Sequence, residues 1–109
     1  MVNQSISRFD IWLVQLDPTK GHEIKKKMPC IVILPDEMSL LKTAIVVPMT
    51  SKGFNFPTRI QCTFQGQKGL ILLDQIRAVD KSRLVKKLGV ISKITQIKVC
   101  DCLQELFAY

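Results

Sequence analysis

The chain of 109 residues is long enough to form one domain around a single hydrophobic core, and short for two domains. Hydrophobic residues make up 47% of it and charged residues 23%, a balance that excludes an intrinsically disordered protein. Sixteen Lys and Arg residues against nine Asp and Glu give a formal net charge of +7, which favours a polyanionic partner: nucleic acid, an anionic membrane or an acidic protein segment.

The first residues lack the basic and apolar regions of a secretory signal peptide. The longest apolar runs, such as residues 30–34 and 70–73, are far too short to cross a bilayer. We therefore expect a cytoplasmic protein without membrane association. The cysteines show neither C-x-x-C nor histidine spacing, so we expect free thiols and neither a metal ion nor another cofactor.

Five short runs rich in β-branched and apolar residues predict strands, because each is bounded by turn-forming residues. They cover residues 10–17, 30–35, 43–50, 58–64 and 69–79. The fourth run alternates apolar and polar side chains, as a strand with one buried face does, with these apolar positions: Ile60, Cys62 and Phe64. The second and third runs are apolar throughout, which is typical of strands covered on both faces. The sequence therefore predicts a mainly β fold, most simply a small twisted barrel.

Three helical segments accompany these strands. Residues 36–42 and 80–89 each begin with an aspartate that can act as a cap, and both predict short helical covers. Residues 92–109 contain no Gly or Pro and begin with a capping serine, Ser92. One face of this C-terminal helix is apolar and carries Val99, Cys102, Leu103 and Leu106.

Polar residues cluster at three places along the predicted strands, where a rigid sheet can hold them yet leave them accessible. The first cluster is His22 and Glu23 with the lysines that follow, the second is residues 50–52, and the third is residues 74–77. Cleavage of RNA without a metal needs a base for the ribose 2'-OH proton, an acid for the leaving 5'-oxygen and donors for the charge on phosphorus. The three clusters contain these residue types.

Two interpretations of the clusters stay open at the level of residue types. In the catalytic interpretation, His22, Glu23 and Asp74 serve as acid or base, and the phosphate is held by Thr50, Ser51, Lys52 and Arg77. In the structural interpretation, the lysine run is a solvated loop, residues 50–52 form an ordinary turn, and Asp74 is the ion-pair partner of Arg77.

The order of the motifs resembles one family. The segments "DIWLVQLDPTKGHE", "MPCIVILP", "VVPMTSK", "FPTRI" and "GLILLDQIRAVDKSRLVKKLG" are together similar to the MazF/PemK toxins of bacterial toxin–antitoxin modules. The resemblance runs from about residue 8 to residue 89, and we expect it to extend to the C-terminus, so that the whole chain, 1–109, is one toxin domain.

This resemblance implies an SH3-like barrel with a C-terminal helix, a homodimer, and metal-independent endoribonuclease activity on single-stranded RNA at short sequence motifs. It also implies a cognate antitoxin with an acidic, flexible tail, which suits the net charge of +7. Operator DNA is expected to be bound only through the toxin–antitoxin complex.

The family motifs can be carried over by position. His22 and Glu23 match the family's G-[SH]-E loop, Thr50 matches its active-site threonine or serine, and Asp74 and Gln75 match its [DE]-Q strand. The resemblance thus implies that His22, Glu23, Thr50 and Asp74 are catalytic. Contacts to RNA are expected from Lys25, Lys27, Ser51, Lys52, Gln75 and Arg77.

Three positions depart from the family pattern. Met28 stands where the family usually has an arginine that acts in catalysis, and Leu72 stands where the PemK branch has a second one. Residues 8–10 read R-F-D in place of the common R-G-D. Lys27 and Arg77 are candidates to replace the missing charge, although adjacent residues of a strand point to opposite faces and Lys27 would need a local bulge. The sequence therefore predicts altered or reduced ribonuclease activity.

Two other functions are compatible with these observations. A catalytically impaired family member would act as a module that binds antitoxin, RNA or operator DNA. A gyrase inhibitor similar to the CcdB toxins would share the fold, but fold alone does not assign function, and the RNA-handling motifs disfavour it.

Overall fold

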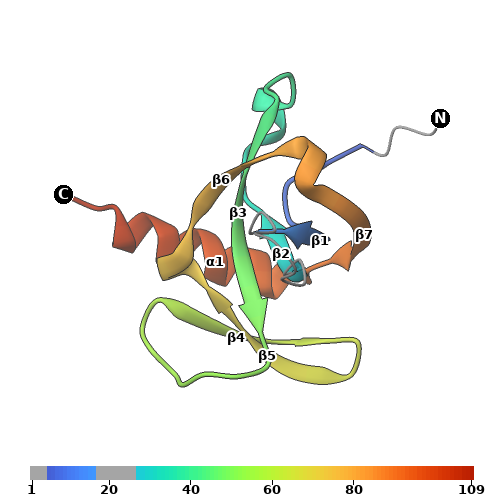
Figure 1. The fold of residues 1–109 in the computed structure, drawn as a ribbon. Coiled ribbons are helices and arrows are strands. Elements are labelled where there is room, and N and C mark those ends of the chain that lie inside the picture. Colours follow the sequence, from blue (N-terminus) through green and yellow to red (C-terminus); the bar gives the residue numbers. More distant parts are fainter. Residues whose placement is uncertain (1–4, 17–26) are drawn as a thin grey trace, which may run out of the picture.

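The computed structural model describes residues 5–16 and 27–109, and within them the chain folds into seven antiparallel strands and one α-helix (Figure 1). The strands are β1 (Asp10–Gln15), β2 (Lys27–Val32), β3 (Thr43–Thr50), β4 (Arg59–Phe64), β5 (Gln67–Leu72), β6 (Arg77–Asp80) and β7 (Leu84–Val90). The helical elements are α1 (Lys93–Leu106) and three 3-10 turns, η1 (Asp36–Met38), η2 (Leu73–Gln75) and η3 (Lys81–Arg83). No helix in these stretches has the length and apolar composition that a membrane span requires.

The strands form one curved sheet in the order β4-β5-β3-β2-β1-β7, and β6 pairs with β3 outside this row. β3 therefore contacts three strands: β6 along its first half, β2 along its middle and β5 at its end. The result is an antiparallel half-barrel with one C-terminal helix, which confirms the mainly β, twisted-barrel fold predicted from the sequence.

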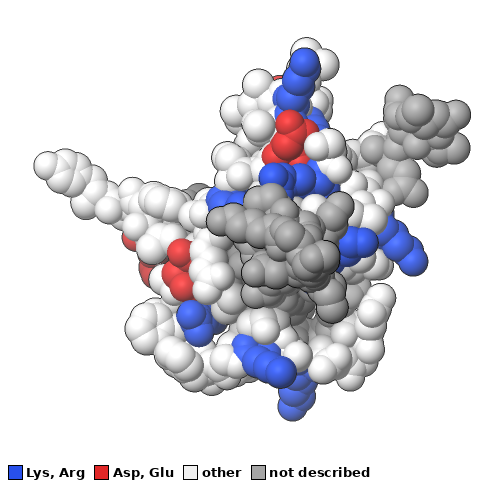
Figure 2. Space-filling model, in the orientation of Figure 1, with Lys and Arg blue, Asp and Glu red and all other residues white. Residues whose placement is uncertain are grey.

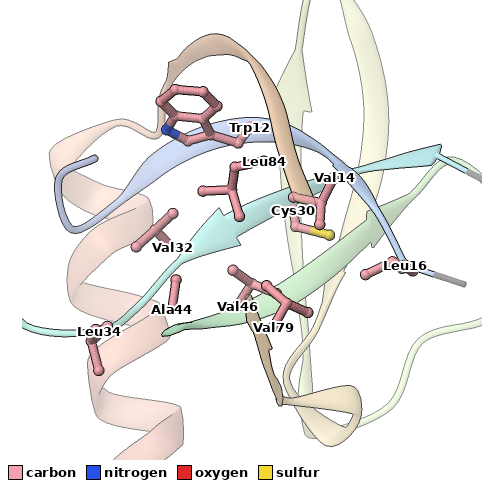
Figure 3. Close-up of a cluster of buried hydrophobic side chains, with 10 residues drawn as sticks. All are labelled: Trp12, Val14, Leu16, Cys30, Val32, Leu34, Ala44, Val46, Val79 and Leu84. Carbon is pink, nitrogen blue, oxygen red and sulfur yellow. The ribbon is translucent and has the colours of Figure 1, made fainter. Parts of the chain in front are cut away.

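The central strands are apolar on both faces, as their sequences predict. On one face, Val32 and Val46 belong to a core that side chains of β1, β6 and β7 complete (Figure 3). On the other face, Ile31 and Val47 belong to a second core, to which α1 contributes Val99. Val46 and Val47 are neighbours in the chain and are both fully buried, so β3 supplies the middle layer between two cores.

The helix α1 begins at its predicted cap. The Ser92 hydroxyl accepts a hydrogen bond from the backbone N–H three residues later, at 3.3 Å. Val99 is fully buried, and Cys102 and Leu103 pack beside it against the second core. Leu106, which the sequence pattern placed on the same buried face, is instead 38% exposed, because the last turn of α1 runs past the edge of the sheet (Figure 1).

The prediction of one continuous strand over residues 69–79 is wrong, because the structure has two strands there, separated by a turn. β5 ends at Leu72, the turn η2 follows with Leu73 fully buried, and β6 begins at Arg77. The break has a topological cause: β5 pairs with the end of β3, whereas β6 pairs with the beginning of the same strand. The chain must turn between these two places, so no single straight strand can satisfy both.

The predicted helix over residues 80–89 is also largely wrong. The Asp80 carboxylate does accept a hydrogen bond from the backbone N–H of Ser82 at 2.9 Å, as a cap should. The helical turn nevertheless ends at Arg83, and β7 follows and pairs with β1. This pairing gives β1 its second neighbour and buries Leu84, so tertiary pairing overrides the local helical preference.

Phe9 lies in the left-handed backbone region, with a φ of 74°. Its N–H donates to the carbonyl of Val32 at 2.6 Å, and its own carbonyl accepts from the N–H of Ile91 at 3.2 Å. Its ring packs against the second core, and the Arg8 guanidinium lies 4.8 Å from the ring centroid. These contacts hold a non-glycine residue in a conformation that costs about 1–2 kcal/mol.

Because of this strain, we expect Phe9→Gly to be more stable than Phe9→Ala by about 1 kcal/mol, the reverse of the usual order in a strand or helix. Both variants lose the ring, and only glycine also relieves the backbone. Chemical denaturation of the two variants beside the wild type measures the difference. An alanine variant as stable as the glycine variant would show that Phe9 carries no strain.

Candidate functional site

A hollow of about 260 Å³ opens where β2, β3 and β5 meet, at the end of β3. Its walls mix apolar side chains with a hydroxyl pair, an amide and one ammonium. The lining residues are Met28, Pro29, Met49, Thr50, Ser51, Phe64, Gln67, Lys68 and Gly69. Two of the positions singled out in the sequence, Thr50 and Ser51, therefore lie together in a concave surface.

Strand register explains why three of these side chains share one face. Cys30 pairs with Pro48 across β2 and β3, and extending this register by two residues places Met28 opposite Thr50. On the other side, Thr50 pairs with Leu70 of β5, and residues two apart in a strand point to the same face. Lys68 therefore lies on the same face as Thr50, one strand over and diagonal to it.

The Thr50 side chain is oriented by a local hydrogen bond. Its Oγ1 accepts from the backbone N–H of Lys52 at 3.1 Å, which leaves the hydroxyl proton free to donate into the hollow. Thr50 is half-buried at the last position of β3, directly after four buried residues, 46–49. The hydroxyl is thus placed by rigid structure and remains reachable from solvent.

Gly69 allows the two strands around Thr50 to approach closely. A Cβ atom at this position would lie 3.0 Å from the carbonyl oxygen of Thr50 and 3.6 Å from its carbonyl carbon. Backbone atoms cannot move away as the end of a flexible side chain can. A larger residue at position 69 would therefore displace the Thr50 backbone.

A second hollow of about 520 Å³ continues from the first, with which it shares Ser51, Lys68 and Gly69. It runs over β4 and the 51–58 loop toward α1. Polar groups predominate among the remaining lining residues, which are Gly53, Asn55, Gln61, Cys62, Thr63, Leu70 and Lys98. The two hollows form one continuous groove, with a lysine at the junction and another at the far, more polar end. We call it the Thr50–Lys98 groove.

Charged side chains are unevenly distributed on the face of the molecule shown in Figure 2. Lys and Arg side chains are spread over the face shown in Figure 2, whereas Asp and Glu appear there in two small groups, one beside α1 and one near the start of β3. With a net charge of +7, such a surface attracts polyanions.

Asp74 is held by a neighbouring strand outside the groove. Arg59 donates to it from Nε at 3.3 Å and from a terminal nitrogen at 3.4 Å, and Thr58 donates from Oγ1 at 3.1 Å. The hydrogen bond from Arg59 is the main cause of a lowered pKa of Asp74. The structural interpretation predicted an ion pair between Asp74 and Arg77. That prediction is wrong, because the Arg77 guanidinium donates to the carbonyl of Leu16 at 3.3 Å.

Arg59 also fixes the loop that leads into β4. A terminal nitrogen donates to the carbonyl of Phe54 at 3.4 Å, and the guanidinium lies 4.9 Å from the Phe54 ring centroid and 5.9 Å from that of Phe56. The Arg59 and Asp74 side chains are 16% and 34% exposed. This pair therefore ties the start of β4, the turn η2 and the loop between β3 and β4 into one unit.

The cysteines add no negative charge to the groove. All four are free thiols, and burial raises the pKa of Cys30 to about 12. Burial also raises the pKa of Cys62, which lies in the second hollow. Neither side chain is a thiolate near neutral pH, so neither has the reactive form that nucleophilic chemistry needs.

Comparison with known proteins decides the family. The sequence profile described as "PemK-like, MazF-like toxin of type II toxin-antitoxin system" matches residues 7–107. The chain belongs to the PemK/MazF toxin family. It is 31% identical over 105 residues to a protein named Endoribonuclease MazF from Staphylococcus epidermidis, an alignment that covers 90% of this chain and 88% of that one.

Solved structures of low sequence identity show the same fold. MazF from Deinococcus radiodurans superposes with a TM-score of 0.80 at 21% identity, covering 98% of this chain and all of that one. An endoribonuclease from a mycobacterial species, solved in complex with its cognate antitoxin, has a TM-score of 0.77 at 18% identity, with 92% of each chain covered.

The structure brings together some of the residues that the PemK/MazF motifs point to, and separates others. Thr50 and Ser51 line the groove, and the Lys52 N–H orients Thr50. Asp74 lies with Arg59 beyond the groove lining. Three other positions predicted to contact RNA line neither hollow: Lys52, Gln75 and Arg77.

Four of the residues predicted to be catalytic or to contact RNA precede Met28 in the sequence. His22, Glu23 and Lys25 are outside the described residues, and their roles stay predictions from the sequence. Lys27 pairs with Gln15 of β1 and adjoins Met28, so strand alternation directs it to the opposite face from Met28 and Thr50.

Sequence reasoning missed Lys68, Gln61, Asn55 and Lys98 in the groove, and also Arg59 as the partner of Asp74. A signal existed for Lys68: it stands two residues before Leu70 in the "QKGLIL" strand, next to the glycine that allows β3 to approach. Gln61 and Arg59 are placed by cross-strand register, and Asn55 and Lys98 by the packing of a loop and of α1; the sequence specifies none of these.

The pair of Asp74 and Arg59 predicts a pH dependence of stability. Because the folded pKa of Asp74 is lowered below its unfolded value of about 3.9, the pair contributes stability above that value. This contribution is lost as the pH falls through the folded pKa. We therefore expect Asp74→Asn to destabilise the protein more at about pH 6 than at about pH 3.

Urea denaturation at the two pH values measures this gap. Asp101→Asn, which removes an exposed carboxylate from α1, is the matched control for the general effect of one negative charge. An equal effect of Asp74→Asn at both pH values would show that Arg59 does not stabilise the carboxylate.

Proposed function

We propose that this chain is a toxin of a type II toxin–antitoxin system that cleaves single-stranded RNA at short sequence motifs without a metal ion. The observation that carries the proposal is the Thr50 hydroxyl, held at a strand end inside a groove that contains two lysines and several amide and hydroxyl groups. The endoribonuclease name of its Staphylococcus epidermidis relative supports the same reaction.

The reaction is an internal displacement at phosphorus. The ribose 2'-oxygen attacks the adjacent phosphate as its proton passes to a base, and the 5'-oxygen leaves as an acid protonates it. The products carry a 2',3'-cyclic phosphate and a 5'-hydroxyl. Thr50 donates a hydrogen bond to a phosphate oxygen, and His22 and Glu23 are proposed for the two proton transfers. Asp74 shapes the site through its ion pair with Arg59. Asp74 could transfer a proton directly only to a substrate that reaches beyond the groove.

RNA follows the Thr50–Lys98 groove in this proposal. Lys68 and Lys98 supply positive charge to the backbone, and Ser51 and Thr63 supply hydroxyl donors. Gln61 donates from Nε2 to Oδ1 of Asn55 at 3.0 Å, which leaves the Asn55 amide donors and the Gln61 carbonyl available to a base edge. Single-stranded RNA suits the groove because its unpaired bases are free to enter it.

The methionine at position 28 lowers the expected rate. It lies opposite Thr50, at the place of the family's catalytic arginine, and a thioether neither donates a proton nor stabilises negative charge. Loss of one such donor typically costs about 2.7–4 kcal/mol, or roughly a hundredfold to a thousandfold in rate. Reduced activity is therefore part of the proposal.

The proposed partners are an acidic antitoxin and a second copy of the chain. The net charge of +7 supports the first, as does the mycobacterial relative of the same fold that was solved with its antitoxin. Three exposed apolar side chains at the junction of β7 and α1 support a further protein contact: Val90, Ile94 and Ile97, which are 55%, 68% and 52% exposed. Operator DNA would be bound through the complex with antitoxin.

Met28 also motivates a second function, a module that binds antitoxin and RNA without cleaving. This alternative predicts RNA binding in the groove and no cleavage at any enzyme concentration. The two functions are distinguished by one assay.

In that assay, the purified protein is incubated with a long single-stranded RNA in EDTA, and new 5' ends are mapped. We expect cleavage at a recurring short motif and at least about a hundredfold loss in Thr50→Ala, because the variant lacks the hydroxyl donor. Cleavage that persists in both Thr50→Ala and His22→Ala would place the active site elsewhere. Cleavage by Met28→Arg alone would establish the binding module.

A second prediction uses Gly69. The Cβ of Gly69→Ala would press on the Thr50 carbonyl, so we expect the single-turnover rate to fall by about tenfold or more through misplacement of the hydroxyl. The thermal unfolding of the variant, measured beside its rate, separates local displacement from general instability. An unchanged rate in a variant that folds would show that the position of Thr50 is not critical.

A further inference from the structure

We propose that Lys68 supplies the positive charge at the scissile phosphate that Met28 does not, so that the cation has moved from one side of Thr50 to the other. This inference rests on the proposed ribonuclease function and names a residue that contacts the substrate in that reaction. No covalent bond to Lys68 forms; its ammonium contacts the non-bridging phosphate oxygens as negative charge develops on them.

Strand geometry places Lys68 as a counterpart of Met28. Thr50 stands on the middle strand, Met28 opposite it on β2, and Lys68 diagonal to it on β5, all on one face. Diagonal cross-strand neighbours lie about 7–8 Å apart, within reach of a long side chain. A phosphate bound at the Thr50 hydroxyl is therefore accessible from either neighbouring strand.

Lys68 is also available for this contact. Its side chain is exposed, and within residues 5–16 and 27–109 no hydrogen bond or ion pair holds its ammonium. Gly69 allows β5 to approach the end of β3, which brings the neighbouring lysine close to the Thr50 backbone. Lys68 also belongs to both hollows, so a chain that follows the groove must pass it.

The other candidate cations are bound to other groups or lie outside the hollow around Thr50, as Lys52 does. Arg77 donates to the carbonyl of Leu16, and Arg59 is shared between Asp74 and the carbonyl of Phe54. Strand alternation directs Lys27 to the opposite face of β2. Among the described residues, Lys68 is the one cationic side chain that lines the hollow around Thr50.

The test compares kcat and KM for RNA cleavage in EDTA among the wild type, Lys68→Ala, Lys68→Arg, Met28→Arg and the double variant Met28→Arg/Lys68→Ala. We expect Lys68→Ala to lower kcat by about a hundredfold or more, since a transition-state contact is lost. Lys68→Arg keeps the charge and should retain most of the rate. Met28→Arg should restore at least about tenfold in the Lys68→Ala background, because it returns a cation to the other side of Thr50.

Lys86→Ala is the matched control, because it removes an equally exposed lysine from β7, away from the groove. Its rate should equal that of the wild type. Thermal unfolding of each variant checks that the fold is intact.

Three outcomes in which at least one of the proteins cleaves RNA would overturn the inference. In the first, the wild type cleaves RNA, and Lys68→Ala folds and has a kcat within about threefold of the wild-type kcat. Another is a Lys68→Ala that raises KM alone, which would make Lys68 a binding contact only. The third is a wild type that never cleaves while Met28→Arg does, which shows that Lys68 fails to replace the arginine. Absence of cleavage by every variant rejects the ribonuclease itself, and with it any role for Lys68 in the reaction.

Discussion

The burial of β3 on both faces is the constraint on which the rest of the molecule depends. A strand that separates two cores must be apolar at every position, and β3 meets this requirement from Ala44 to Met49. It also pairs with three strands, so β2, β5 and β6 are all positioned by it. Thr50, its last residue, is where the covering layers end, and a polar side chain there becomes accessible without losing its rigid support.

The groove follows from this ending. Beyond Thr50 the chain leaves the sheet for the 51–58 loop, and the space beside it is bounded by β2 on one side and by β4 and β5 on the other. Gly69 sets the distance between β5 and Thr50, and Arg59 with Asp74 fixes the loop. A site assembled on strand ends in this way has a pre-organised framework, because the Thr50 hydroxyl and the backbone around it are positioned by contacts that exist before any ligand binds.

The sequence predicted those features that depend on local pattern. The strand over 43–50 coincides with the observed β3, and Ser92 caps the helix as expected, because strong periodicity and capping chemistry are encoded within a few residues. The break between β5 and β6 and the strand β7 were missed, since both result from pairing with distant strands. For the same reason, Thr50 was found through its motif, whereas Lys68 and the partner of Asp74 required the register of the sheet.

A methionine at position 28 moves the positive charge that faces the phosphate to another strand in the proposed site, and it also changes the surroundings of the phosphate. Met28 is half-buried and packs against the first core, so it forms an apolar wall opposite Thr50. Less water beside a bound phosphate lowers the local dielectric constant, which strengthens the attraction of a single lysine for the developing charge. An arginine at the same place would bind the phosphate through two parallel hydrogen bonds, whereas Lys68 acts as a point charge from the opposite strand. In the proposed reaction, the apolar wall formed by Met28 and the lysine on β5 are complementary, so the methionine alone does not identify an inactive site.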